Sequence, residues 1–590
     1  MKRYFYNFLS TLALLIIISN VVAAQAQQDD SNPGATRTGA ISGQVVNESG
    51  QPLANALVGI RTYGFGGANR TTTTDNEGKF QVNGLEPVAY LVSASYPAYV
   101  SVPRDPDVNP IGYYRIGDSI RLEMMKGGVI TGTVTKSTGE PVVVVLVRAY
   151  MVRDSKGQPA RYVAPFREQT TDDRGVYRIY GLPPGTYVVS AGGGNRSPYN
   201  VNAFETDAPT YAPASTRDTA TEIYVSPGQE TANVDIRYRG EPGHAVSGSA
   251  AGNISTDQPM GFSITLSSIF NGASQASYST FQPPNSHGFS FYGVADGDYD
   301  VIAQSFLPGG EWIISEPRRI KVKGADITGV ELTAAPLGSI SGHVVLEESK
   351  APECKDKRRP LFEETLVTPW HNEKNVPKDQ PQFVWGLGSP TLPNKQGDFT
   401  LRSLTPGQYR FNARPMAKYW YLKSISWPPP TTTPAKAPAS NRPADAARNW
   451  TTLKAGDRFS GLTITIAEGA ASLRGHIDLA EGQKLPSRLF IYLVPAERER
   501  ADDILRYFAS LASADGSFAL DNLPPGRYWV IAQAANENES NVLSKLRLPD
   551  ETEMRARLLH DAETSKIETE IKPCQNVNDY RLPFRSAALQ

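Results

Sequence analysis

Short runs in which apolar and polar residues alternate around a glycine recur five times along the chain. Alternation with a period of two is typical of a β-strand with one buried face. The five runs are Ile41-Ser42-Gly43-Gln44-Val45, Ile130-Thr131-Gly132-Thr133-Val134, Val246-Ser247-Gly248-Ser249, Ile340-Ser341-Gly342-His343-Val344 and Leu473-Arg474-Gly475-His476-Ile477. This self-similarity predicts repeated units, each of which opens with one such strand.

A second signature follows each opening run. In the second unit it is Asp172-Asp173-Arg174-Gly175-Val176-Tyr177, followed by Leu182-Pro183-Pro184-Gly185-Thr186-Tyr187. The Asp-x-x-Gly segment predicts a tight turn, because the aspartate bonds its own backbone and the glycine accepts a positive φ. The aromatic residue after it is expected to face the core, and Leu-x-Pro-Gly predicts a second turn. The tyrosine then begins a returning strand, with its ring inward and its hydroxyl near a backbone partner.

The other units carry the same signature, which is weakest in the third. The equivalent tyrosines are Tyr90, Tyr299, Tyr409 and Tyr528. Most units also end on a strand led by a glycine turn, as in Gly228 before Val234-Asp235-Ile236 and Gly461 before Leu462-Thr463-Ile464. Each unit is therefore expected to be a complete β-sandwich.

The predicted organisation has eight segments. They are a signal peptide (1–26), a disordered segment (27–37), five β-sandwich units at 38–126, 127–240, 241–336, 337–470 and 471–573, and a C-terminal tail (574–590). The third unit is divergent and the fourth carries long insertions. Junctions such as Lys126-Gly127-Gly128-Val129 leave little room for linkers, so we expect a bent rod rather than loosely tethered units.

The paired signature resembles that of the carboxypeptidase regulatory-like domain family. The resemblance extends over most of the chain, from about 38 to 573. It implies an all-β fold, a tandem array of about five transthyretin-like, seven-stranded β-sandwich modules, related to the collagen-adhesin B-type repeats and to Ig-like and carbohydrate-binding-like folds. It implies a structural or binding role without peptidase activity, because in metallocarboxypeptidases this module is an appendage to the catalytic domain.

The first residues are typical of a secretory signal peptide. Lys2 and Arg3 precede an apolar run from Leu9 to Ile18, and Ala24-Gln25-Ala26 matches a cleavage site. We therefore expect an exported protein, extracellular or in the periplasm and cell envelope, that begins near Gln27. The alternative is an uncleaved anchor, for which the apolar run is short. No later stretch is long and apolar enough to span a membrane.

The composition limits the classes of partner molecule that the chain can bind. The chain has 590 residues, too many for one sandwich core, and 59 Lys plus Arg against 60 Asp plus Glu. This balance argues against a general nucleic-acid binder, which needs a basic surface. The two cysteines, Cys354 and Cys574, either form one disulfide in an oxidising compartment or remain free thiols.

The sequence predicts no catalytic residue, metal site or cofactor. The six histidines are dispersed, and neither H-E-x-x-H nor G-x-S-x-G occurs. His560-Asp561-Ala562-Glu563 has the spacing of two zinc ligands but no third ligand, and is better explained as part of a charged helix over 551–563. Asp296-Gly297-Asp298-Tyr299-Asp300 and Asp105-Pro106-Asp107-Val108-Asn109 could hold Ca²⁺, although a polar turn is the favoured interpretation of both.

Aromatic residues in three insertions are the candidate ligand-binding residues. The insertions lie at 192–220, 418–450 and 350–395. The candidates are Tyr199, Tyr211, Trp370, Trp385, Trp420, Tyr421 and Trp427. Aromatic rings beside polar residues on loops suit the stacking of sugars, whereas the alternative for each ring is packing within its own unit.

These features favour an exported, non-catalytic binding or scaffold protein whose ligand is a carbohydrate or a cell-surface protein. A structural stalk or adhesin-like spacer is the first alternative. A peptidase or glycosidase is less favoured, because a string of small sandwiches offers no cleft except between units.

Overall fold

The structure is a computed structural model that describes residues 38–584, except 63–68, 103–111, 158, 161–165, 194–202, 254–260, 271–272, 285, 287, 308–310, 373–387, 429–443, 481 and 536–541. The predicted signal peptide, the segment 27–37, Tyr199, Trp385 and the Asp105–Asn109 segment lie outside the described residues. We refer to residues 38–126, 127–240, 241–336, 337–470 and 471–584 as units 1 to 5.

The described chain is almost entirely β-structure. Unit 1 contains β1 (Gly39–Asn47), β2 (Leu57–Thr62), β3 (Asn69–Thr73), β4 (Lys79–Leu85), β5 (Tyr90–Ser95), β6 (Tyr99–Ser101) and β7 (Ser119–Lys126). Unit 2 contains β8 (Gly128–Thr135), β9 (Leu146–Asp154), β10 (Phe166–Thr170), β11 (Val176–Leu182), β12 (Gly185–Ala191), β13 (Thr210–Tyr211), β14 (Ile223–Val225), β15 (Glu230–Thr231) and β16 (Ile236–Arg237). Unit 3 contains β17 (His244–Gly252), β18 (Phe262–Phe270), β19 (Ala273–Gln282), β20 (Phe289–Val294), β21 (Gly297–Phe306), β22 (Trp312–Ser315), β23 (Arg318–Val322) and β24 (Ile327–Pro336).

Units 4 and 5 follow the same pattern. Unit 4 contains β25 (Gly338–Glu347), β26 (Thr365–His371), β27 (Asp398–Leu404), β28 (Gly407–Pro415), β29 (Trp420–Trp427), β30 (Ala444–Asp445), β31 (Thr451–Leu453) and β32 (Arg458–Glu468). Unit 5 contains β33 (Ala471–Leu479), β34 (Leu489–Pro495), β35 (Phe508–Leu511), β36 (Ser517–Leu523), β37 (Gly526–Ala534), β38 (Glu568–Ile571) and β39 (Asn576–Phe584), with helices α2 (Val542–Leu546) and α3 (Thr552–Ser565). Short 3₁₀ turns lie at Arg217–Thr219, Pro352–Cys354, Phe362–Glu364, Arg498–Arg500 and Ile504–Arg506.

One strand arrangement recurs in all five units. The opening strand (β1, β8, β17, β25 or β33) pairs antiparallel with the strand after the first turn of the second signature (β4, β11, β20, β27 or β36). On its other side it pairs in parallel with the last strand (β7, β16, β24, β32 or β39). The predicted all-β, transthyretin-like fold class is confirmed. The count of five modules remains a prediction that this recurrence supports.

Two details differ from the expected pattern. The segment predicted as a C-terminal tail contains β39, which pairs in parallel with β33, so unit 5 does not end at residue 573. In unit 3, β22 pairs with both β21 and β24 and thereby joins the two halves into one eight-stranded sheet.

The glycine of the opening run is required by close strand packing. A Cβ atom at Gly132 would lie 2.1 Å from the carbonyl oxygen of Val234 on the neighbouring parallel segment. At Gly342 it would lie 2.1 Å from the carbonyl oxygen of Leu462 and 2.5 Å from the ring of Phe399, the aromatic residue of the second signature. The two halves of the repeat signature therefore meet in space, and a side chain at the glycine would collide with both partners.

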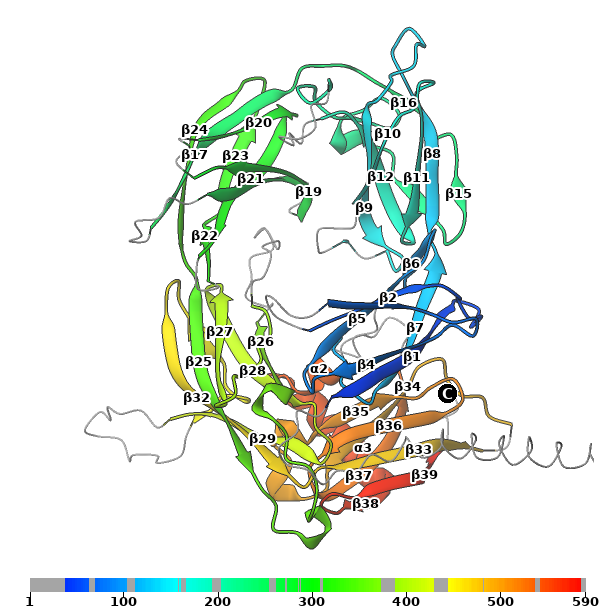
Figure 1. The fold of residues 1–590 in the computed structure, drawn as a ribbon, viewed down its shortest axis with the longest axis vertical. Coiled ribbons are helices and arrows are strands. Elements are labelled where there is room, and N and C mark those ends of the chain that lie inside the picture. Colours follow the sequence, from blue (N-terminus) through cyan, green and yellow to red (C-terminus); the bar gives the residue numbers. More distant parts are fainter. Residues whose placement is uncertain are drawn as a thin grey trace, which may run out of the picture.

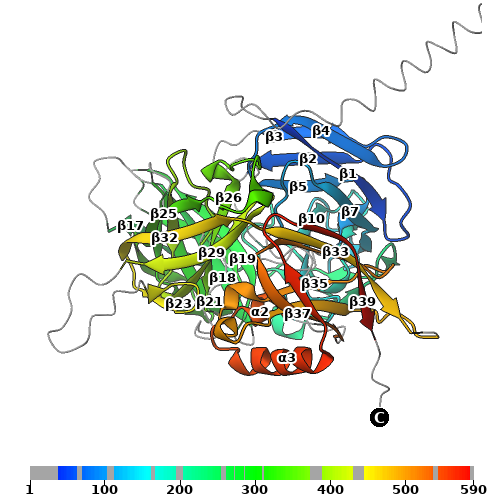
Figure 2. The ribbon, with the colours of Figure 1, turned by 90° about the horizontal axis from the view of Figure 1, so that it is seen from below.

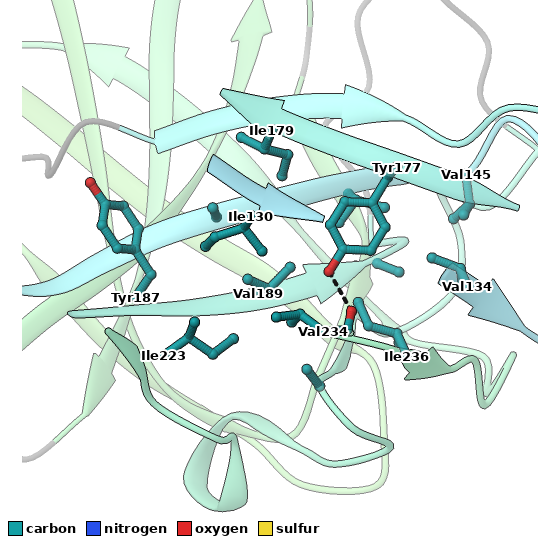
Figure 3. Close-up of a cluster of buried hydrophobic side chains, with 14 of the residues drawn as sticks. Ile130, Val134, Val145, Tyr177, Ile179, Tyr187, Val189, Ile223, Val234 and Ile236 are labelled. Atoms are coloured by element: carbon teal, nitrogen blue, oxygen red, sulfur yellow. Dashed lines mark hydrogen bonds between the residues drawn. The ribbon is translucent and has the colours of Figure 1, made fainter. Parts of the chain in front are cut away.

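The tyrosine of the second signature also has a fixed role. Figure 3 shows Tyr187 at one end of the buried cluster of unit 2 and Tyr177 farther along it. The hydroxyl of Tyr187 donates to the carbonyl oxygen of Pro183 at 2.7 Å. The equivalent bonds in the other units run from Tyr90 to Glu86, Tyr299 to Ala295, Tyr409 to Thr405 and Tyr528 to Pro524. Each tyrosine thus ties its strand to the preceding turn, as predicted.

The units follow a closed path rather than a rod. In Figure 1 unit 1 (blue) lies against the lower units, while units 2 (cyan) and 3 (green) form the upper part. Ala89 and Tyr113 of unit 1 share a buried apolar cluster with Leu366 and Met416 of unit 4. The expectation of a bent rod is therefore wrong, because contacts between segments remote in sequence bring unit 1 back onto unit 4.

The helices belong to unit 5. Val542, Leu546, Leu558 and Ala562 of α2 and α3 form a buried cluster with Phe490, Tyr492 and Val494 of β34. Figure 2 shows α3 on the outside of this unit. The charged helix predicted over 551–563 is confirmed.

Within the described part of the chain, no helix has the length and apolarity needed to cross a membrane.

Candidate functional site

The predicted aromatic candidates in the fourth unit lie on a strand rather than on a loop. Trp420 begins β29, which pairs with β32, and its side chain is fully buried. Its indole Nε1 donates to the carbonyl oxygen of Arg358 at 3.2 Å. A ring that is covered on both faces cannot stack on a sugar, so the prediction of a ligand-binding role for Trp420 is wrong.

Trp427 and Tyr421 are half-buried on the same strand. Trp427 Nε1 donates to Thr451 Oγ1 at 3.1 Å, and the ring meets Phe411 and Phe459 edge to face. Burial is the main cause that raises the pKa of Tyr421. Trp427 therefore packs within unit 4, rather than offering its ring to a sugar.

The remaining described candidates are also engaged inside the protein. Tyr211 lies on β13 and is only 6% exposed, so it cannot present its ring to a ligand. Trp370 lies on β26, where the guanidinium of Arg410 stacks on its ring at 4.4 Å from the centroid. The described candidates therefore do not assemble into one sugar-binding platform.

The two cysteines form a disulfide between units 4 and 5. Cys354 and Cys574 are both buried and bonded to each other, with a separation of 220 residues in sequence. The bridge ties the loop after β25 to the turn before β39. The alternative of two free thiols is excluded in this structure. The bridge also anchors the turn from which β39 runs alongside β33.

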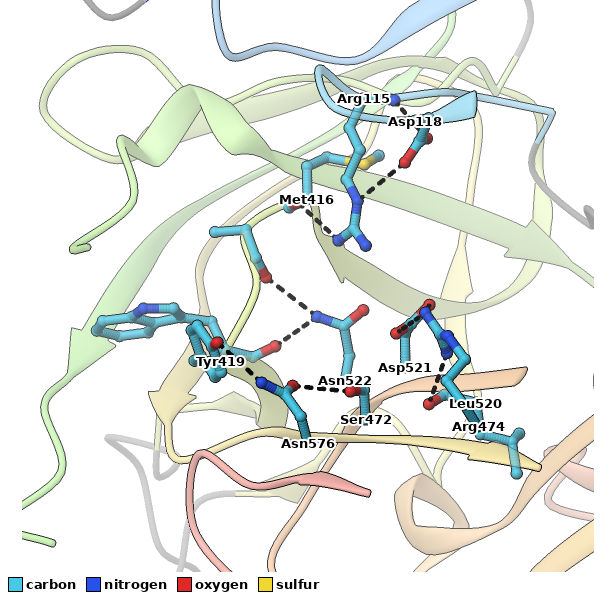
Figure 4. A network of polar contacts seen from close by, with 12 residues as sticks. Arg115, Asp118, Met416, Tyr419, Ser472, Arg474, Leu520, Asp521, Asn522 and Asn576 are labelled. Carbon is cyan, nitrogen blue, oxygen red and sulfur yellow. Dashed lines mark hydrogen bonds and ion pairs between the residues drawn. The ribbon is translucent and has the colours of Figure 1, made fainter. Parts of the chain in front are cut away.

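Hydrogen bonds hold the two units in one orientation near this disulfide. Asn522, at the end of β36, donates to the carbonyl oxygens of Trp420 at 2.7 Å and Ala417 at 3.1 Å. Asn576 donates to the hydroxyl of Tyr419 at 3.2 Å and accepts from Ser472 at 2.9 Å (Figure 4). The bonds of Asn522, and that of Asn576 with Tyr419, join unit 5 to unit 4, so polar contacts specify the orientation of the two units.

Apolar contacts complete the junction. Ile504 of unit 5 is buried within the main hydrophobic cluster of unit 4, and Leu505 packs against the same cluster. Because these side chains leave their own sandwich, units 4 and 5 share part of a core. Such shared packing is expected to resist domain motion.

A cleft of about 830 Å³ lies beside this junction. One wall is the end of β28 in unit 4, and the other walls are β35, β36 and the outer side of β33 in unit 5. We call it the 4/5 cleft. Its volume is within the range of about 300–1,000 Å³ that is typical of ligand pockets.

Arginine is the main charged residue of the cleft. Arg414, Arg474 and Arg547 line it, against Asp521 and Asp579. Arg474 and Asp521 neutralise each other through two contacts of 2.8 and 3.1 Å. Burial lowers the pKa of Arg414, and the charge of Arg115 acts in the same direction.

Arg547 contributes a second cation from the segment after α2. Its Nε donates to the carbonyl oxygen of Tyr507 at 3.1 Å, and its guanidinium stacks on Phe508. Burial lowers its pKa to about 10, so it remains protonated at neutral pH. Burial, together with the charges of Arg547 and Arg555, also lowers the pKa of nearby Arg410 to about 10.

The strands that border the cleft on the side of unit 5 are sheet edges. β36 pairs only with β33, and β35 pairs only with β34 among the described strands. Edge strands carry a row of backbone groups that can pair with another chain. The cleft therefore combines cationic side chains with free strand edges.

The described residues do not build a recognisable catalytic group. His476 lines the cleft, but Ser517, opposite it in the sheet register, donates its hydroxyl to Asp515 at 2.6 Å. No cluster of three or more His, Cys, Asp or Glu suited to a metal ion occurs among the described residues. The Ca²⁺ candidate at 296–300 is not supported, because buried Asp300 forms a bidentate ion pair with Arg319 at 2.5 and 3.0 Å.

The recurrence of the opening glycine, the aromatic residue and the tyrosine can be compared with known families. Residues 40–116 match the carboxypeptidase regulatory-like domain family. The predicted resemblance is thereby confirmed for unit 1. No curated protein matches the chain.

Several of the similar solved structures are pilins. BcpA, the major pilin subunit of Bacillus cereus, is 11% identical with a TM-score of 0.13, over 50% of this chain and 99% of that chain. The shaft pilin SpaA of Lactobacillus rhamnosus GG is 13% identical with a TM-score of 0.16, over 34% and 98% of the two chains. GBS52, the minor pilin of Streptococcus agalactiae, is 15% identical with a TM-score of 0.15, over 36% and 96%. At these values the similarity carries no argument about function.

The sequence could not reveal the 4/5 cleft. In the sequence, Arg414 has the same pattern as any polar residue on the outward face of a strand. Arg547 belongs to a segment that carries no repeat signature. Their proximity depends on the disulfide and on Asn522, whose partners are remote in sequence.

Proposed function

We propose that this chain is an exported, non-catalytic binding protein that holds a partner molecule in the 4/5 cleft. The observation that carries the proposal is the cleft itself, which lies between two units joined by a disulfide, by Asn522 and by a shared core. A site between rigidly connected units is preorganised, so little ordering entropy is lost when a ligand binds.

Export is supported by two independent features. The first 26 residues have the pattern of a signal peptide. The Cys354–Cys574 disulfide is the kind of bond that persists in an oxidising compartment. Together they favour the periplasm, the cell envelope or the extracellular space.

The closed path of the units favours binding over the alternative of a spacer. A spacer whose units only set length gains from an end-to-end arrangement, whereas unit 1 packs here against unit 4. The burial of Trp420 and Tyr211 and the covered rings of Trp370 and Trp427 favour a protein partner over a carbohydrate.

The test is a binding assay on the purified chain and on a Ser510→Trp variant, which fills the cleft without changing its charge. Four soluble probes are titrated by biolayer interferometry: cellohexaose, polygalacturonate, a glutamate decapeptide and a lysine decapeptide. The proposal predicts saturable binding of at least one probe that Ser510→Trp removes. No binding of any probe, or binding unchanged in the variant, contradicts it.

A further inference from the structure

The ligand of the 4/5 cleft can be assigned a chemical class from the groups that line it. The cleft has one cation without a described partner, further arginines nearby, and two free strand edges. Each feature limits what can bind, and the inference rests on the proposed function of the cleft as a binding site.

Arg414 is the cation without a partner. Its guanidinium makes no hydrogen bond or ion pair with any residue in the described ranges, although it is half-buried in the cleft wall. The carboxylates whose charges act on it include Asp118 of unit 1 and Asp521 of unit 5, and each of these is already engaged, by Arg115 and by Arg474. An arginine presents five N–H donors in a planar fork that matches a carboxylate.

The potential around Arg414 is positive. Arg547 lines the same cleft, and neither Arg547 nor Arg555 forms an ion pair with a described carboxylate, since both donate to backbone carbonyl oxygens. Asp579 is the one carboxylate of the cleft lining without an ion pair in the described part of the chain. Two unneutralised arginines against one aspartate favour an anionic ligand over a neutral or cationic one.

The shape of the lining favours an extended chain. β36 lies along the cleft from Ser517 to Asn522 with one edge unpaired in the sheet. At about 3.3 Å per residue, such an edge matches a segment of some five or six residues. Added strands gain affinity from main-chain hydrogen bonds and specificity from alternate side chains.

The aromatic content of the cleft argues against an acidic glycan. Phe518 is buried, and the ring of Phe508 is covered by the guanidinium of Arg547. These two phenylalanine rings therefore offer little surface for sugar stacking. A peptide needs no such surface, because its backbone binds the strand edge.

We propose that the 4/5 cleft binds an extended acidic segment of a partner protein, which pairs with the free edge of β36 and places a carboxylate against Arg414. The carboxylate accepts hydrogen bonds from the guanidinium. The backbone N–H and C=O groups of the segment form hydrogen bonds with the unpaired backbone groups at the edge of β36.

The test uses an acetylated glutamate decapeptide, which like-charge repulsion keeps extended, and a glutamine decapeptide of the same length. Both are titrated calorimetrically into the full chain, into Arg414→Gln and into Arg318→Gln, an exposed arginine of unit 3 that serves as the matched control. Loss of one charge-assisted, bidentate contact is expected to weaken binding about tenfold or more in Arg414→Gln, with no change in Arg318→Gln. The glutamine peptide is expected to bind at least tenfold more weakly than the glutamate peptide.

Four results would overturn the inference. Glutamate-peptide binding that is equal in Arg414→Gln and wild type removes the role of Arg414, with thermal melting used to confirm that the variant is folded. If Arg414→Gln does not fold, glutamate-peptide binding that persists in Ser510→Trp also overturns the inference, because the peptide then binds outside the cleft. Binding of polygalacturonate in the cleft without binding of the glutamate peptide rejects the peptide class but leaves the proposed function intact, whereas failure of every probe rejects both.

Discussion

The guanidinium of Arg115 donates a hydrogen bond of 2.8 Å to the carbonyl oxygen of Met416, which lies 301 residues later in the chain. Asp118 holds the arginine in place through its Nε at 3.3 Å. Arg115 belongs to unit 1, whereas Met416 directly follows β28 of unit 4, next to the junction with unit 5 (Figure 4). The contact closes the path of the units and places unit 1 beside the cleft.

Opening this contact should extend the molecule. In a Tyr113→Ala, Arg115→Ala variant, unit 1 loses a buried apolar contact and a charge-assisted hydrogen bond to unit 4. Such bonds contribute about 1.5–3 kcal/mol each. Small-angle X-ray scattering is expected to show a larger radius of gyration and maximum dimension. Arg121→Ala, which removes an exposed ion pair of the same unit, should leave both unchanged; equal scattering of all three proteins would refute the closure.

Substitution of the repeat glycine should destabilise its unit strongly. In Gly132→Ala the new methyl group would overlap the carbonyl oxygen of Val234, so the parallel strand has to move. Overpacking of this kind costs about 1–3 kcal/mol or more. Gly59→Ala is the matched control, because its nearest neighbour would lie at an ordinary contact distance of 3.5 Å. Calorimetric melting should show a loss of stability for the first variant only.

The disulfide should stabilise the junction as well as the fold. In the Cys354→Ser, Cys574→Ser variant, the free energy of unfolding, measured with guanidinium chloride, is expected to be about 2–5 kcal/mol lower than in the wild type. The reason is that the bridge closes a loop of 220 residues and anchors the turn before β39. A reducing agent should lower the stability of the wild type to that of the variant and leave the variant unaffected. An unchanged wild type under full reduction would contradict this role.

The turn before β36, which contains Asp515, should contribute to acid sensitivity. The pKa of Asp515 is lowered, first by the hydrogen bond from the side chain of Ser517 and then by that from its backbone N–H. A carboxyl group whose folded pKa lies below the unfolded value stabilises the protein above the unfolded pKa, and this stabilisation is lost as pH falls through the folded pKa. The melting temperature of Asp515→Asn should therefore fall less than that of the wild type between about pH 5 and pH 3. Parallel curves for the two proteins would show that the turn does not contribute.

The fold was predictable because its signature residues touch one another. Gly342 and Phe399 meet within a single unit, and Tyr409 bonds a carbonyl group four residues away. Such contacts recur at fixed spacing, so the sequence displays them as a repeat. The last strand of unit 5 was missed because Asn576–Phe584 is mostly exposed and pairs with β33, which lies far earlier in the chain.

The candidate site was not predictable for a related reason. Trp420 looks like a loop aromatic in sequence, since nothing near it indicates that β29 joins the sheet next to β32. Arg414 becomes a cleft residue only when Asn522 and the disulfide fix unit 5 beside unit 4. Contacts between units depend on single residues rather than on a period, so no pattern in the sequence marks them.

The most direct test of binding in the 4/5 cleft is hydrogen–deuterium exchange of the full chain with and without the acetylated glutamate decapeptide. Slower exchange is expected in β36, at the end of β28 and around Arg547, because the peptide pairs with the strand edge and covers the cleft. Exchange in the strands of unit 3, remote from the cleft, should not change. Unaltered exchange in β36 at saturating peptide, or protection confined to other units, would contradict the account.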